Sequence, residues 1–212
     1  RIADTVEDTR FIDGETKSEL LESYADLVEG HYSGEAGYED VDEWVSQVSE
    51  SLNDYEIDDL DEDMESVDED HWDLVRNAHA AFSSYQKFDQ GPKIDVGQSV
   101  KEMAEGMADY VEDGGIRIVD EDDLFRYCHI VAGTVGDLLT DLFLIKAENV
   151  DEEVLRENSE DYAQLLQRIN IARDPVADLK EEDARFIPET FMDLTHEEFA
   201  SEVDEAVESK HT

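Results

Sequence analysis

The sequence predicts an all-α protein, and three observations support this fold class. Wherever apolar residues recur in a regular pattern, they do so at three- and four-residue steps, which is the period of a helix. No alternating pattern typical of a half-buried strand competes with it. Only three prolines, at 92, 175 and 188, interrupt the 212 residues. With 40% apolar residues the chain can bury a core, and we expect one domain over 1–212.

The helical patterns and the breaks between them alternate along the chain. The expected helices, in order, are 18–30, 41–53, 71–86, 96–113, 124–143, 151–179 and 196–209. The breaks are marked by glycine, proline and clustered polar residues, at 31–40, 89–93, 112–123 and 185–189. The mostly acidic segment 54–70 predicts an exposed loop or a frayed helix start.

A calcium-binding loop within this acidic segment is rejected. Asp59, Asp61 and Asp63 have the opening spacing of an EF-hand loop. However, Met64 stands where that loop requires glycine, and Asp70 stands where it requires glutamate.

The clearest helix is 124–143, whose apolar residues include Leu124, Phe125, Cys128, Val131, Val135, Leu138, Leu139, Leu142 and Phe143. We expect it to lie in the core. Gly133 and Gly136 each cost this helix about 1 kcal/mol relative to alanine, so something approaches it closely, either a packed helix or a ligand chain. His129 is expected to be a partnered core or rim histidine. Tyr127 is either a satisfied buried phenol or a group that handles a proton.

Two short stretches place acidic residues four apart, one helical turn. Residues 4–8 read "DTVED", and residues 170–178 read "NIARDPVAD". Like charges at this spacing repel each other on a helix. Two such faces can hold Mg²⁺ between them, because magnesium prefers carboxylate oxygens and completes its shell with water and phosphate oxygens. Arg1 and Arg173 accompany these faces as cations suited to phosphate.

The net charge of −44 is spread along the whole chain. A strongly carboxylated surface is typical of a protein from a salt-rich cytoplasm, where ionic strength screens self-repulsion, so we expect a halophilic source. An acidic surface for a basic partner would instead be one concentrated patch. Nucleic acid is excluded as a partner, because phosphate contacts need clustered Lys and Arg.

The single cysteine, Cys128, forbids an intrachain disulfide and a cysteine-based zinc site. No apolar run is long enough to span a bilayer, and no signal peptide is visible. We therefore expect a cytoplasmic protein. Because Arg1 opens directly into a motif without an initiator Met, we interpret the chain as a fragment truncated at both ends.

Several motifs together resemble one family, the squalene and phytoene synthases. "RIADTVED" at 1–8 resembles its first aspartate-rich motif, and "YCHIVAGTVG" at 127–136 resembles its central helix. "QRINIARDPVAD" at 167–178, followed by "RFIP", resembles its second aspartate-rich motif. The form "CHIVAGTVGDLLTDLF" is more similar to the squalene branch, and combined with the acidic surface it suggests a halophilic archaeon.

The resemblance implies an all-helical isoprenoid synthase bundle with a central active-site cavity. It assigns magnesium and diphosphate to Asp4, Asp8, Asn170, Asp174 and Asp178. It further implies diphosphate contacts at Arg1 and Arg173, a polar substrate position at Gln167, proton handling at Tyr127, and a prenyl channel lined by Val131, Val135 and Leu139.

Two departures from the family pattern bear on these assignments. Ala177 stands where members usually have an acid just before the last aspartate of the second motif. Pro175 lies inside the expected helix, so we expect a kink that re-aims Asp178.

The function implied by the resemblance is that of squalene synthase. Two farnesyl diphosphates condense head to head in a Mg²⁺-dependent reaction, through presqualene diphosphate, with final reduction by NADPH. The alternative within the family is a phytoene or dehydrosqualene synthase, which needs no NADPH; "RFIP" is also similar to that branch. A second alternative is a non-catalytic acidic helical interaction protein. The apolar product leaves room for a peripheral membrane contact.

Overall fold

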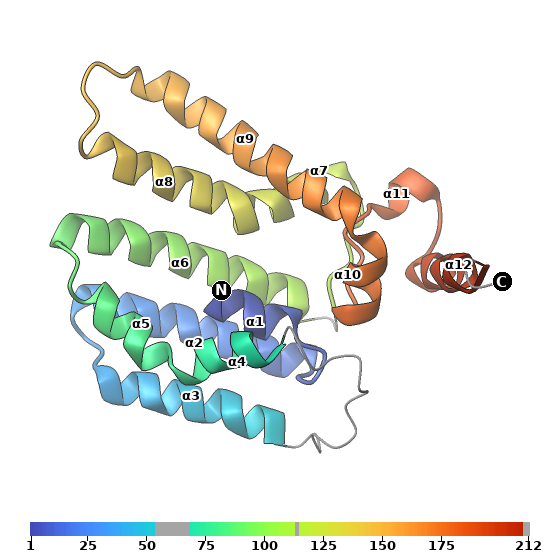
Figure 1. Ribbon diagram of the computed structural model, residues 1–212, viewed down its shortest axis with the longest axis horizontal. Helices are drawn as coiled ribbons and strands as arrows, with labels where there is room; N and C mark the ends of the chain where they lie inside the picture. The colour runs from blue at the N-terminus through green and yellow to red at the C-terminus, as the bar shows by residue number, and fades with distance from the viewer. Residues whose placement is uncertain (54–67, 113–114, 210–212) are drawn as a thin grey trace.

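The computed structural model describes residues 1–53, 68–112 and 115–209, and within them the fold is all helical (Figure 1). The helices of the first half are α1 Ile2–Asp8, α2 Gly14–Ser33, α3 Tyr38–Asn53, α4 Asp68–Arg76, α5 Ala78–Tyr85 and α6 Gln90–Val111. The second half contains α7 Glu121–Cys128, a π-helical turn at His129–Gly133, α8 Thr134–Leu144, α9 Glu152–Arg173, α10 Pro175–Glu181, α11 Glu189–Met192 and α12 His196–Ser209. The predicted fold class is confirmed.

The helices form a layered bundle with a smaller unit at one end. In Figure 1, α6 lies between the antiparallel pair α8 and α9 on one side and α2 with α3 on the other. The main core joins α1, α2, α3 and α6 to the central helix. Trp44 of α3 anchors this side: its indole Nε1 donates to the Leu20 carbonyl at 3.0 Å, and its ring lies 4.9 Å from that of Tyr24.

The central helix differs from the expected regular core helix in two respects. It begins at Glu121, and its middle turn, His129–Gly133, is π-helical. Its apolar face is also only partly buried, because Leu139 is 62% exposed and Phe143 59%. A three- and four-residue period shows that a helix has an apolar face, but not whether that face meets protein or an open groove.

Two of the expected helices are each divided in two. The stretch 71–86 breaks at Asn77, between α4 and α5. The stretch 151–179 ends at Arg173, and Pro175 occupies the first turn of α10. The expectation of a kink inside one helix was wrong: proline lacks an N–H and is favoured at the first position of a helix. Residues 54–67 of the acidic segment lie outside the described residues, and they include Asp59 to Met64 of the rejected calcium loop. Helix α4 begins at Asp68.

The end unit packs α12 on α10. Leu179, Phe199 and Val203 form a small second apolar cluster there. Arg185 has no exposed side-chain surface and connects this unit to the bundle. Its Nε donates to the Ile187 carbonyl at 3.1 Å and its Nη1 to the Leu194 carbonyl at 2.8 Å. Its backbone also pairs with the 116–118 segment in an isolated parallel bridge.

Candidate active site

The first acidic face lies on α1. Ile2, Ala3 and Val6 are buried in the main core. Because side chains four apart share one face of a helix, this burial leaves Asp4 and Asp8 together on another face.

The second acidic face lies where α9 meets α10. Although Pro175 ends α9, the backbone N–H of Asp174 donates to the Asn170 carbonyl at 3.2 Å, and that of Asp178 donates to the Asp174 carbonyl at 3.0 Å. These two bonds keep the three residues one turn apart across the break. Arg173 lies beside them, with its Nη2 2.6 Å from Asp174 Oδ2. The break therefore preserves the predicted face.

Both faces open onto one cavity of about 370 Å³. Its walls come from α1, the central helix, α9, α10 and the adjoining segments. They include most of the predicted site residues. The polar and charged lining residues are Arg1, Asp4, Glu7, Asp8, Tyr127, Gln167, Asn170, Arg173, Asp174, Asp178 and Glu182. The structure thus brings together side chains that lie more than 160 positions apart in the sequence.

The carboxyl groups of α1 lie in an unfavourable environment for negative charge. Burial, together with the neighbouring Asp4, raises the pKa of Asp8 from 3.8 to about 7. Burial, followed by the charges of Asp8 and Asp4, raises the pKa of Glu7 well above its usual value. Lys17 opposes this trend: it is buried, and its Nζ donates to the Glu7 backbone carbonyl at 2.6 Å. A further cation near these carboxylates would be stabilised.

Tyr127 is a buried phenol whose hydroxyl faces this cavity. Its O–H donates to Glu7 Oε1 at 3.4 Å, and its ring packs 5.0 Å from that of Phe186 and 5.2 Å from that of Tyr110. Burial, followed by the negative charges of Glu7, Asp8 and Glu182, raises the pKa of Tyr127 well above its usual value. Both expectations for Tyr127 therefore remain compatible: it is satisfied, and it has a proton partner.

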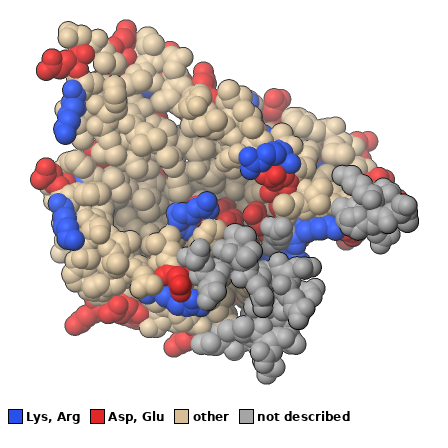
Figure 2. Space-filling view, viewed as in Figure 1, with Lys and Arg blue, Asp and Glu red and all other residues tan. Residues whose placement is uncertain are grey.

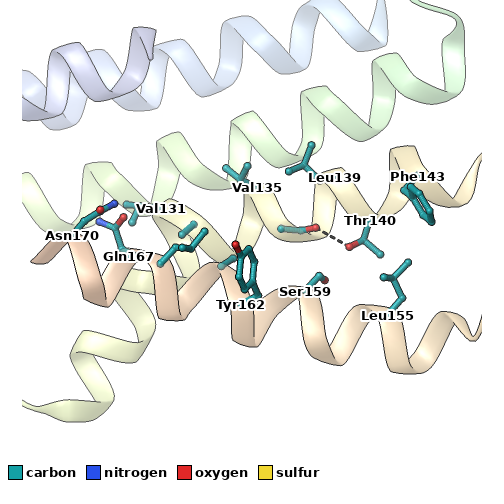
Figure 3. Close-up of a pocket in the computed structure, with 14 residues that line it drawn as sticks. Val131, Val135, Leu139, Thr140, Phe143, Leu155, Ser159, Tyr162, Gln167 and Asn170 are labelled. Carbon is teal, nitrogen blue, oxygen red and sulfur yellow. Dashed lines mark hydrogen bonds between the residues drawn. The ribbon is translucent and has the colours of Figure 1, made fainter.

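An apolar groove of about 460 Å³ continues from the acidic cavity. Val131, Gln167 and Asn170 line both spaces, so the two adjoin each other. Figure 3 shows the groove running between α8 and α9, with Asn170 and Gln167 at one end and Phe143 and Leu155 at the other. The predicted channel residues Val131, Val135 and Leu139 all line it. Figure 2 shows a hollow in the middle of the molecular face drawn there, with mostly uncharged walls and with basic and acidic side chains at one end.

The two glycines of the central helix have separate explanations. A Cβ on Gly136 would lie 3.1 Å from both the Ala163 Cβ and the Ser159 carbonyl oxygen, so α8 and α9 pack tightly there. A Cβ on Gly133 would lie 2.6 Å from Nδ1 of His129, one turn earlier in the same helix. His129 itself is a partnered rim residue, as predicted, because its Nδ1 lies 3.0 Å from Glu160 Oε1.

Comparison with known proteins identifies the family of this chain. A family model described as squalene/phytoene synthase matches residues 1–209. The chain belongs to the squalene/phytoene synthase family. The squalene synthases of this family generally use magnesium and NADPH, with farnesyl diphosphate as substrate.

Individual relatives within the squalene/phytoene synthase family carry names for more than one product. A probable squalene synthase of Neurospora crassa is 30% identical over 88% of this chain and 34% of its own length. Botryococcus squalene synthase of Botryococcus braunii is 33% identical over 53% of this chain and 24% of its own length. Lycopaoctaene synthase of the same organism is 32% identical over 51% of this chain and 24% of its own length. The chain thus spans about a quarter to a third of the length of these relatives.

The donor set of the acidic cavity fits the magnesium that the squalene/phytoene synthase family uses. It consists of carboxylates and one amide, which are the oxygen donors that magnesium prefers. Across the described residues, no group of three or more His, Cys, Asp and Glu side chains is arranged to hold a metal ion. Magnesium is usually bound through one or two carboxylates with water and substrate phosphates completing its shell, so a shared site with diphosphate fits this arrangement.

Sequence reasoning missed three residues of the cavity and its surroundings. Glu7 lies between the two predicted aspartates of α1, and Lys17 lies on the neighbouring helix α2. Glu182 lines the cavity four residues after Asp178. The spacing 174, 178 and 182 was a usable signal for Glu182, and it returns a carboxylate to a motif in which Ala177 lacks one. Nothing in the sequence distinguishes Lys17 from other lysines. In the described part of the chain, no helix is long and apolar enough to cross a membrane.

Proposed function

We propose that this protein is a squalene synthase. It joins two farnesyl diphosphates head to head, through presqualene diphosphate, and reduces the product to squalene with NADPH. One observation carries the proposal: two acidic faces and two arginines surround a single cavity that continues into an apolar groove. A charged diphosphate with an apolar chain matches both parts of this space.

The charged end of the site binds and orients the diphosphate. Arg1 and Arg173 supply guanidinium groups suited to phosphate oxygens, and Asn170 with Gln167 supplies neutral polar groups at the junction with the groove. When bound between Asp4, Asp8, Asp174 and Asp178, magnesium supplies positive charge that stabilises a departing diphosphate.

The apolar groove holds the prenyl chain against its walls. Loss of diphosphate leaves an allylic cation, which water would quench, so the walls around it must be dry. Val131, Val135 and Leu139 provide apolar walls that a bound chain would cover. Their partial exposure in the protein alone means that a bound chain would remove apolar surface from water, which is favourable.

Tyr127 and Glu7 form the proton-handling pair. Formation of the cyclopropane ring releases a proton from a prenyl carbon. We assign this proton to the Tyr127 oxygen, whose own proton passes to Glu7 Oε1 along the existing hydrogen bond. NADPH would supply the hydride of the last step, and its use is inferred from the family without assignment to residues of this chain.

The test of the metal and diphosphate assignment uses two separate substitutions in the intact protein. Asp4→Asn and Asp174→Asn should each lower turnover by about 100-fold or more, while circular dichroism shows unchanged helix content. Asp26→Asn, an exposed position on α2 outside the cavity, is the matched control. Turnover equal to that of the control in either cavity variant would refute the assignment.

A product assay tests the branch of the family. The protein is given farnesyl diphosphate and magnesium with and without NADPH, and the assay is repeated with geranylgeranyl diphosphate. We expect squalene only when NADPH is present. Phytoene from the longer substrate, or an unreduced product unaffected by NADPH, would assign the protein to the carotenoid branch.

In a non-catalytic interaction protein the two acidic pairs would be accidental. Both pairs line one cavity, which favours a shared role in binding. Such a protein would show no magnesium-dependent thermal stabilisation by an unreactive farnesyl diphosphate analogue. We further propose a cytoplasmic location with peripheral membrane contact, because squalene partitions into lipid. Cell fractionation, with and without a salt wash of the membranes, tests this.

A further inference from the structure

The apolar groove ends at two facing side chains. Phe143 is the last residue of α8 to line it, and Leu155 is the first residue of α9 to do so (Figure 3). Beyond them the chain leaves both helices and turns through 145–151 (Figure 1). Neither side chain has a polar atom. These two residues can therefore act on a prenyl chain only through apolar contact and through their size.

Two contacts between α8 and α9 set the width of the groove, one near Phe143 and one at Gly136. Near the end lined by Phe143 and Leu155, Arg156 Nη2 lies 2.7 Å from Asp141 Oδ1, an ion pair that joins α9 to α8. Farther along, the close approach at Gly136 fixes the spacing of the same helices. These two contacts hold α8 and α9 at their present spacing along the groove.

The length of the groove can be compared with that of a prenyl chain. From Val131, at the junction with the acidic cavity, to Phe143 there are twelve residue steps, or about 18 Å along a helix. An extended carbon chain advances about 1.2 Å per bond, so an isoprene unit of four main-chain bonds spans about 5 Å. Three units end before Phe143, whereas a fourth must pass it.

We propose that Phe143 and Leu155 form a chain-length stop that selects a farnesyl chain over a geranylgeranyl chain. This inference rests on the proposed function, because it assumes that a prenyl diphosphate occupies the cavity and the groove. Phe143 provides most of the obstruction, because its ring is the larger side chain. The stop acts on binding, and so it is independent of how the final cation is discharged.

The test measures dissociation constants for two unreactive thiolodiphosphate analogues, farnesyl and geranylgeranyl, with magnesium and without NADPH. The unchanged protein should bind the farnesyl analogue at least about tenfold more tightly, a size of discrimination that pocket contacts can supply. Phe143→Ala should reduce this ratio about tenfold, chiefly by tightening the geranylgeranyl analogue. Leu155→Ala should act in the same direction, and Phe143→Trp should oppose it.

The matched control is Phe191→Ala, which removes an equally exposed phenylalanine, 59% in both cases, from α11 outside the groove. It should leave the ratio unchanged. If neither analogue binds the unchanged protein, the proposed function fails and the stop fails with it. If both bind but the ratio is near one, or does not respond to Phe143→Ala, the stop alone is refuted.

Discussion

At the scale of single residues, Asp8 is a carboxyl group that the fold holds where its charge is unfavourable. Its pKa rises from 3.8 to about 7, first through burial and then through Asp4, while Lys17 and Arg1 oppose the shift. Between these two pH values the folded protein binds more protons at this site than the unfolded chain does. The free energy of unfolding therefore falls as the pH rises through this window.

We predict that Asp8→Asn, measured without magnesium, raises the melting temperature relative to the unchanged protein more at pH 8 than at pH 5. The amide removes a charge that only the higher pH produces. Asp13→Asn is the control of opposite sign, because hydrogen bonds from Thr16 hold the pKa of Asp13 below its usual value. Equal effects of Asp8→Asn at both pH values would contradict the assignment.

Arg185 is a second residue whose burial decides its role. Removing its guanidinium leaves the Ile187 and Leu194 carbonyls without their donors and the Phe199 ring without the cation 4.8 Å from its centre. We predict that Arg185→Met lowers the free energy of unfolding by about 3 kcal/mol, measured by urea denaturation. Arg126→Met, at a mostly exposed ion pair, should change it by less than about 0.5 kcal/mol. Similar midpoints for the two variants would show that Arg185 does not hold the end unit.

At the scale of elements, the contact between α8 and α9 depends on one missing side chain. Because Gly136 has no side chain, α9 approaches α8 closely. A Cβ added at Gly136 would lie 3.1 Å from the Ser159 carbonyl oxygen. The same contact forms part of the groove wall. Tight packing at Gly136 and an apolar groove beside it therefore occur together, although the sequence suggested them as alternatives.

We predict that Gly136→Val lowers the melting temperature, because two branched methyl groups would have to displace backbone of α9. Gly91→Ala is the matched control, since a Cβ at Gly91 in α6 meets nothing within 4 Å. Alanine there should raise stability by up to about 1 kcal/mol through helix propensity. A Gly136→Val protein as stable as the unchanged one would show that the helices can separate.

Helix positions were largely predictable, because the three- and four-residue period depends only on local geometry. The breaks at Asn77 and Asp174 were less so. Pro175 gave a signal, but proline both kinks helices and begins them, and the sequence does not distinguish the two. In the structure Pro175 begins a new helix, and the α10 residue Leu179 is buried with α12.

At the scale of the whole molecule, the net charge of −44 must be tolerated by a compact body. The described ion pairs are few relative to 60 acidic residues, and Lys and Arg total only 16. Self-repulsion therefore reaches farther as ionic strength falls, since the Debye length grows from about 3 Å at 1 M to about 30 Å at 0.01 M.

We predict that the melting temperature falls steeply when KCl is lowered from 2 M to 0.05 M at pH 7. At pH 4, where many carboxyl groups are protonated, the same dilution should have a smaller effect. Equal salt dependence at both pH values would assign the effect to ion-specific solvation instead of charge screening. No dependence at either would argue against a halophilic adaptation.

The sequence by itself determined the all-helical class and the two acidic faces, because both depend on residues within a few positions of one another. Only the tertiary structure decided that α1 and the α9–α10 junction share a cavity, that Glu7 and Lys17 are buried beside it, and that Phe143 and Leu155 line the end of a groove. Burial and contact across more than 160 residues are set by how the helices pack. A local pattern shows which face of a helix is apolar or acidic, but not what that face meets.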